Sequence, residues 1–242
     1  MRMEKQALLV APGNVYKTLQ RGWYTPLSFS GFNVERMNRK LVDKNWSIQC
    51  LQDEKATKEN VLQFFDKPAL SRSREILFYY CGHGDFSSVD GQGESGSNIP
   101  DEFLVLYHQR LEFRAGNIGA AFRDFFLTDD ELTGIVQDIL NREVALTVIL
   151  DCCHAAGMID RAEQFIVGDA PMALFASSTE EERSFANSDT SFFTEALLMA
   201  SGESTQLAGL RQKTQENLRR LLPRQESIIL FNRTQNHKLN FI

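Results

Sequence analysis

Hydrophobic residues along the chain form short runs that alternate with longer amphipathic segments. Runs rich in Val, Ile, Leu, Phe and Tyr predict six β-strands: Ala7–Ala11, Ser47–Leu51, Ile76–Tyr80, Ala145–Leu150, Met172–Ala176 and Ser227–Phe231. Segments with apolar residues every three or four positions predict five helices: Asn33–Asn45, Thr57–Asp66, Asp129–Asn141, Phe192–Ser201 and Leu207–Leu222. Parallel neighbours in a sheet need a crossover element between them. The alternation therefore predicts an α/β fold with a six-stranded, mainly parallel sheet flanked by helices on both faces.

Two further segments lie outside this alternation. The stretch from Asp85 to Pro100 is rich in Gly and Ser, which predicts a flexible loop. The sequence DEFLVLYH follows it and predicts a short strand outside the main sheet. With 242 residues, of which 43% are apolar, the chain can bury a full core, and we expect one domain spanning residues 1–242.

Charge and cysteine content narrow the class of function. The 26 Lys and Arg against 32 Asp and Glu give a net charge of -6, which argues against a general affinity for nucleic acid. The longest apolar run near the N-terminus, Ala7–Pro12, is too short for a signal peptide or a membrane span, so we expect a cytoplasmic protein without membrane contact. The cysteines are too few for a disulfide framework, which leaves four thiols available for chemistry: Cys50, Cys81, Cys152 and Cys153.

Two predicted strands lead directly into residues that can do chemistry. Ile76–Tyr80 runs into Cys81-Gly82-His83-Gly84, and Ala145–Leu150 runs into Asp151-Cys152-Cys153-His154. Ligands of open α/β sheets bind outside the carboxyl ends of the strands, so neighbouring strands would bring His83 and Cys153 together.

A Cys and a His placed in this way can cleave acyl bonds. The thiolate attacks a carbonyl carbon, while the imidazole lowers the pKa of the thiol and later protonates the departing amine. The backbone N–H groups of Gly84 and Cys153 are candidates for the oxyanion hole, since glycine permits close approach. A zinc site is the alternative for such residues, but His83, Cys152, Cys153 and His154 lack the separated pairs of zinc ligands.

The sequences around these residues resemble a known family. FYYCGHGD around His83 and VILDCCHAAG around Cys153 resemble the His and Cys motifs of metacaspases and related caspase-like peptidases. The segments DEKATKENVLQFF, FLTDDEL and SFFTEALL extend the resemblance over most of the chain. It implies a caspase-like fold and a cysteine endopeptidase with Cys153, not Cys152, as nucleophile and His83 as base. Cys81, Cys152 and Ala155 stand where the motifs usually carry Ser.

The residue two positions before the nucleophile bears on substrate choice. Caspases that cleave after acidic residues have Gln there, whereas this chain has Asp151, which would pair with a basic side chain. We assign Asp151 and Cys81 to substrate binding and expect cleavage after Arg or Lys, the preference of metacaspases. Ala186 stands where caspases carry a specificity arginine. The alternative is an acidic preference through Arg21.

The resemblance also implies a calcium site. Asp129, Asp130 and Asp160 match its ligand pattern, so we predict calcium as an activator, although the chemistry itself needs no cofactor. The alternative is that Asp129 and Asp130 only stabilise a helix start, because Thr128 and Glu131 form a T-x-x-E capping box.

The length of one connecting segment bears on how the protein is processed and regulated. The chain between Gly157 and Ala170 is short, so we expect a single-chain, monomeric enzyme that acts on protein substrates and is controlled by calcium or a regulatory protein partner. A catalytically silent caspase-like adaptor is the competing interpretation. Retention of His83, Gly84 and Cys153 favours the enzyme.

Overall fold

The computed structural model describes residues 4–14, 24–67, 70, 72–87, 101–108, 126–159, 171–204 and 206–231. Its main sheet has six strands in the order β2-β1-β3-β7-β8-β9. All neighbours are parallel except β8 and β9, which are antiparallel. The predicted sheet is therefore confirmed, and its strands are β1 (Glu4–Ala11), β2 (Trp46–Gln52), β3 (Ser73–Cys81), β7 (Ala145–Asp151), β8 (Met172–Ala176) and β9 (Ile228–Phe231).

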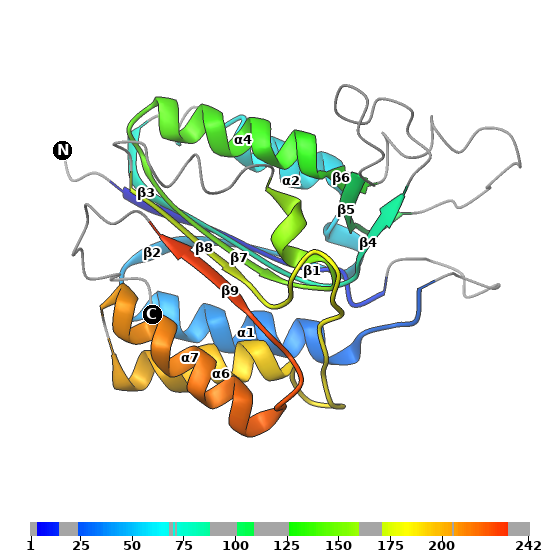
Figure 1. Ribbon diagram of the computed structural model, residues 1–242. Helices are drawn as coiled ribbons and strands as arrows, with labels where there is room; N and C mark the ends of the chain where they lie inside the picture. The colour runs from blue at the N-terminus through cyan, green and yellow to red at the C-terminus, as the bar shows by residue number, and fades with distance from the viewer. Residues whose placement is uncertain are drawn as a thin grey trace, which may run out of the picture.

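Helices cover both faces of this sheet (Figure 1). One face carries α1 (Ser28–Val42), α6 (Phe192–Glu203) and α7 (Leu207–Leu221), and the other carries α2 (Lys58–Phe65) and α4 (Asp129–Asn141). Because successive side chains of a strand point to opposite faces, the central strand β3 contributes to two cores. Phe78 and Tyr80 pack on the side of α2 and α4, whereas Tyr79 and Cys81 pack on the side of α1 and α6.

A second, antiparallel sheet lies beyond the carboxyl end of β3. It consists of β4 (Gly84–Ser87), β5 (Asp101–Val105) and β6 (Phe126–Thr128). The predicted extra strand is confirmed as β5. The prediction of a loop from Asp85 is wrong at its start, because β4 pairs with β5 there, and residues 88–100 lie outside the described part. Strand β6 was not predicted, since three residues directly before a helix show no period.

Predicted and observed boundaries of helices and strands agree best where the sequence marks both ends of the element. Helix α4 and strand β8 have the predicted limits. Helix α1 begins at Ser28, five positions before the predicted Asn33, and Ser30 and Gly31 in its first turns conceal this start because both are weak helix formers. The Ser30 hydroxyl, fully buried, donates to the Leu27 carbonyl at 2.9 Å. The helix ends at Val42, ahead of Asn45, whose positive φ of 60° turns the chain into β2.

Candidate active site

His83 and Cys153 follow neighbouring strands at the same edge of the sheet. Strands β3 and β7 pair in parallel, and their last partners are Cys81 and Asp151. The Gly82 N–H then donates to the Asp151 carbonyl at 3.2 Å, which continues the pairing beyond the strands. The structure therefore brings together the two segments that carry His83 and Cys153, as the sequence predicted.

Gly84 is in direct contact with the backbone of Cys153. A Cβ atom built on Gly84 would lie 2.1 Å from the Cys153 carbonyl oxygen and 3.1 Å from Cys152 Sγ. Real Cβ atoms essentially never approach another heavy atom below 3.0 Å, and here the obstacle is backbone. Only glycine fits this position, and the two segments assigned to the oxyanion hole lie against each other.

The backbone of a preceding loop fixes the His83 ring. Its Nε2 atom lies 2.7 Å from the Thr25 carbonyl oxygen, and the Tyr24 ring lies 5.1 Å from it between centroids. A carbonyl oxygen can only accept, so Nε2 carries the proton and Nδ1 of the neutral ring remains free to accept one. Partial burial lowers the pKa of His83, while the Thr25 contact and the Asp85 charge act in the opposite direction.

Two serines hold the turn that presents Cys153. The Cys152 N–H donates to Ser177 Oγ at 3.1 Å. The Cys152 carbonyl accepts from the hydroxyls of Ser177 and Ser178, at 2.9 and 3.0 Å. After Cys153 the chain reverses at His154, which has a left-handed φ of 56°. The serines follow directly on β8, so the end of a neighbouring strand fixes the backbone of Cys152, the residue before Cys153.

Cys153 and Cys152 differ in their surroundings. Cys152 is buried in the core beneath α2 and α4, and burial raises the pKa of its thiol well above the ordinary value. Cys153 is partly exposed, and its Sγ atom lies 4.0 Å from the Ser184 carbonyl oxygen. Burial also raises the pKa of Cys153, but contact with the Ser184 backbone and the Arg183 charge lower it. Of the two neighbours, Cys153 is thus the accessible thiol.

Asp151 lies at the centre of a hydroxyl network beside the dyad. Its side chain is 3% exposed. Oδ2 accepts from Ser191 Oγ and from Thr194 Oγ1 (2.5 Å), and Oδ1 accepts from Ser184 Oγ (3.3 Å). Burial raises the pKa of Asp151, whereas the three hydroxyl contacts lower it. Oδ1 keeps unused acceptor capacity, because a carboxylate oxygen can accept more than one hydrogen bond.

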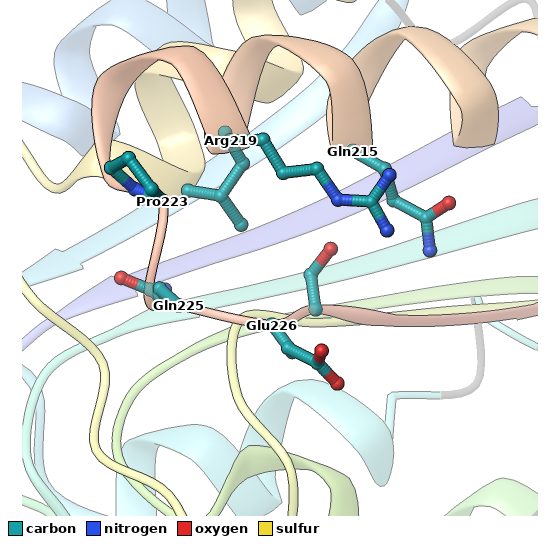
Figure 2. A pocket seen from close by; sticks show the side chains of 7 residues that line it. Gln215, Arg219, Pro223, Gln225 and Glu226 are labelled. Carbon is teal, nitrogen blue, oxygen red and sulfur yellow. The ribbon is translucent and has the colours of Figure 1, made fainter.

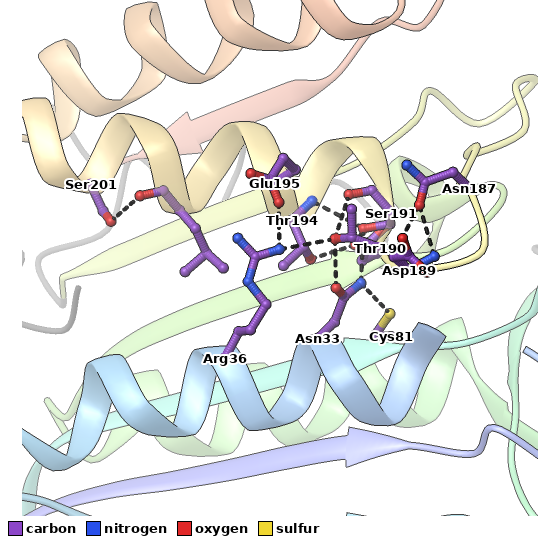
Figure 3. A network of polar contacts seen from close by, with 12 residues as sticks. Asn33, Arg36, Cys81, Asn187, Asp189, Thr190, Ser191, Thr194, Glu195 and Ser201 are labelled. Carbon is purple, nitrogen blue, oxygen red and sulfur yellow. Dashed lines mark hydrogen bonds and ion pairs between the residues drawn. The ribbon is translucent and has the colours of Figure 1, made fainter. Parts of the chain in front are cut away.

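Asn33 connects this network to Cys81 (Figure 3). Its Nδ2 donates to Ser191 Oγ at 3.1 Å and lies 3.5 Å from Cys81 Sγ, while its Oδ1 accepts from Thr190 Oγ1 at 2.7 Å. Of the predicted substrate-binding pair, Asp151 is therefore surrounded by polar groups, whereas Cys81 is fully buried in the core on the side of α1 and α6 and exposes no surface to a substrate. Asn33, Ser191 and Thr194 were not predicted from the sequence as residues of the site. The available signal was a polar residue within the apolar face of a helix, Asn33 in α1 and Thr194 in α6, whereas Ser191 is the N-cap of α6.

Several sequence predictions fall partly outside the described residues. Arg21 and Asp160 lie there, so their placement is not described. Ala186 is described and forms an isolated bridge with Ser191, which places it next to the Asp151 network. All four cysteines are free.

The predicted calcium ligands Asp129 and Asp130 open α4. Asp129 is buried, and its oxygens accept from the N–H groups of Glu102 (3.2 Å) and Asp130 (2.8 Å). The capping box of Thr128 and Glu131 is present. Among the described residues, no three His, Cys, Asp or Glu side chains are placed to hold a metal ion. The described pair does not make a calcium site by itself, and the prediction still depends on Asp160.

Comparisons with known proteins agree with this geometry. The family model for the metacaspase peptidase C14 domain matches residues 27–162, a segment that contains both His83 and Cys153. Metacaspase-6 of Arabidopsis thaliana is 28% identical over an alignment of 175 residues, and the match covers 68% of this chain but only 41% of that protein. The chain thus spans less than half the length of this curated relative.

A solved structure supports the fold. The crystal structure of protein GSU0716 from Geobacter sulfurreducens covers 94% of this chain and 93% of its own, with a TM-score of 0.67 and 16% identity. In the described part of the chain, no helix is long and apolar enough to cross a membrane. Together, the strand-end placement of the two motifs and the family match over more than half of the sequence show that the chain belongs to the metacaspase family of peptidase C14 domains.

Proposed function

We propose that this chain is a cysteine endopeptidase in which Cys153 is the nucleophile and His83 the general base. The observation that carries the proposal is the contact between the two motif segments, in which Gly84 lies directly against the Cys153 backbone. The partial exposure of Cys153, next to the buried Cys152, supports the choice of nucleophile.

The proposed reaction begins from a neutral pair, and not from the thiolate with an imidazole-lowered pKa that the sequence predicted. The lowered pKa of His83 and the raised pKa of Cys153 both favour imidazole and thiol over the ion pair. The thiol proton moves to Nδ1 of His83 as Sγ attacks the scissile carbonyl carbon, while Nε2–H stays on the Thr25 carbonyl. The N–H groups of Gly84 and Cys153 stabilise the oxyanion.

Collapse of this intermediate breaks the C–N bond, and His83 returns the proton to the departing amine. A water molecule, deprotonated by His83, then hydrolyses the thioester and regenerates the thiol. No cofactor enters these steps. The protein supplies orientation, proton transfer and two hydrogen bonds to the developing charge.

We further propose cleavage after Arg or Lys, with Asp151 as the counter-charge. The support is a carboxylate two residues from the nucleophile whose Oδ1 accepts from one hydroxyl, that of Ser184, among the described residues. A guanidinium or ammonium that reaches Oδ1 would complete its hydrogen bonds and offset the cost of burying the charge. Ala186, beside this network, brings no cation that would favour an acidic substrate.

The test is a panel of fluorogenic peptides that differ only at the residue before the cleaved bond. We expect wild-type protein to cleave after Arg or Lys, Cys153→Ala to lose turnover, and Cys152→Ala to retain it. Cleavage only after Asp would overturn the specificity, and active Cys153→Ala protein would overturn the nucleophile. A folded wild-type protein inactive on every peptide would favour the adaptor interpretation.

A further inference from the structure

The amide of Gln225 bonds to both ends of the loop that follows β8. Gln225 precedes β9 and is 2% exposed. Its Nε2 donates to the Ser177 carbonyl at 2.7 Å and lies 3.4 Å from Ser184 Oγ. Its Oε1 accepts from the Phe185 N–H at 3.2 Å. One side chain therefore ties the start of this loop, at Ser177, to the stretch Ser184–Phe185.

Each tied residue contacts the candidate active site. The Ser177 hydroxyl bonds to both the N–H and the carbonyl of Cys152, which precedes the nucleophile. The Ser184 hydroxyl donates to Asp151, and its carbonyl lies against Cys153 Sγ. Gln225 touches neither the nucleophile nor the base, but it fixes the segments on either side of the thiol.

Gln225 also lines a pocket on the outside of the molecule. The pocket has a volume of about 90 Å³ and lies between α7 and the segment leading to β9 (Figure 2). Gln215, Arg219, Pro223 and Glu226 line it as well. The Gln225 N–H also donates to the carbonyl of Leu222, the residue that follows α7, at 3.2 Å, so this hydrogen bond connects the segment that holds Gln225 to the end of the helix.

We propose that Gln225 is a positioning residue, which holds the Ser184–Phe185 stretch against Cys153 and Asp151. This inference rests on the proposed function. One buried amide makes three hydrogen bonds to this loop, two as donor and one as acceptor, and so holds both of its ends with the same group. Small misplacements of groups around a reacting centre cost large factors in rate.

The variant Gln225→Leu tests the proposal, because leucine has a similar size and no hydrogen-bonding group. We expect kcat/KM for a peptidyl-arginine substrate, normalised to titrated active sites, to fall about tenfold or more. Hydrogen exchange of Ser184–Phe185 should accelerate while that of β3 and β7 stays unchanged. The matched control is Ser227→Ala, which removes a buried hydroxyl without a hydrogen-bond partner among the described residues and should behave as wild type.

Gln225→Glu is the second variant if the leucine variant does not fold. It keeps the acceptor for the Phe185 N–H but turns a buried carboxylate oxygen, in place of the donor, toward the Ser177 carbonyl, so we expect a loss in kcat/KM at least as large. Unchanged kcat/KM per site, with or without faster loop exchange, would overturn the positioning role.

The rate at which iodoacetamide labels Cys153, located by mass spectrometry, separates this inference from the proposed function. If the wild-type protein cleaves no peptide, a labelling rate altered in Gln225→Leu and unaltered in Ser227→Ala still supports the inference. An equal labelling rate in all three proteins would overturn it.

Discussion

Burial changes the pKa of His83 and that of Cys153 in opposite directions, and both changes favour the neutral form. The imidazole accepts the thiol proton only when it is uncharged. Because the pKa of His83 lies below its ordinary value of 6.5, the fraction of competent protein stays high under mildly acidic conditions.

This gives a prediction for the pH profile. We expect the acid limb of kcat/KM to have its midpoint below pH 6.5, with activity rising as pH increases through the pKa of His83. Asp85→Asn should move this limb to still lower pH, because the Asp85 charge raises the pKa of His83. The exposed Asp138→Asn serves as control and should leave it in place. An acid limb whose midpoint lies above pH 6.5 and does not move in the Asp85→Asn variant would contradict the assignment of His83 as the general base.

The specificity proposal yields a second prediction at the residue scale. Asp151→Asn keeps the shape of the side chain and removes its charge, so cleavage after Arg should fall about a hundredfold, with the loss of a charge pair of a few kcal/mol. Thermal unfolding checks that the network around Ser191 and Thr194 still folds. Equal rates on peptidyl-arginine for Asp151→Asn and wild-type protein would exclude Asp151 as the counter-charge.

At the scale of elements, the turn from β3 into β4 imposes the strictest requirement. Gly84→Ala places a Cβ 2.1 Å from the Cys153 carbonyl, so the turn or the nucleophile must shift. We expect kcat/KM to fall about a hundredfold or more. Gly134→Ala is the matched control: it lies within α4 with nothing within 4 Å of the added Cβ. It should retain activity and raise the free energy of unfolding by about 1 kcal/mol. Equal activity of both variants would contradict the close approach.

The start of α4 is the element at which calcium binding can be tested. We expect calcium to release heat and raise the peptidase rate in chelator-treated protein, and Asp160→Asn to lose both responses. Asp138→Asn, farther along α4, should keep them. If millimolar calcium gives neither response in the wild-type protein, the acidic residues of this turn serve the helix alone, through the capping box and the backbone bonds of Asp129.

At the scale of the whole molecule, we expect a monomer. The sheet ends on one side in β9, a strand of four residues, and short edge strands pair poorly with a second chain. A net charge of -6 adds repulsion between copies. Light scattering coupled to gel filtration should give a mass near 27.5 kDa, with specific activity independent of protein concentration. A mass twice as large would contradict this expectation.

The sequence by itself determined the six strands of the main sheet, the helices that cover it and the two motifs that follow β3 and β7, but not β4 or β6. Period and caps are local properties, so α4 and β8 were predicted to the residue. The proximity of the segments that carry His83 and Cys153 was predictable because the carboxyl ends of parallel strands lie at the same edge of a sheet. Two segments could be assigned to this edge of the sheet only from their position directly after a predicted strand. They are Cys81-Gly82-His83-Gly84 and Asp151-Cys152-Cys153-His154.

Only the tertiary structure decided what surrounds the dyad. Asn33 and Ser191 are 158 positions apart in sequence, and Gln225 lies 41 positions from Ser184, yet both pairs are within hydrogen-bond distance. The order of strands sets these contacts, because it places the loop after β8 and the start of α6 beside the end of β7. Hydrogen bonds between residues that are distant in the chain produce no periodic pattern in the sequence. Each partner is a residue type that is common in the loop or helix to which it belongs, so nothing in its own segment indicates the partner.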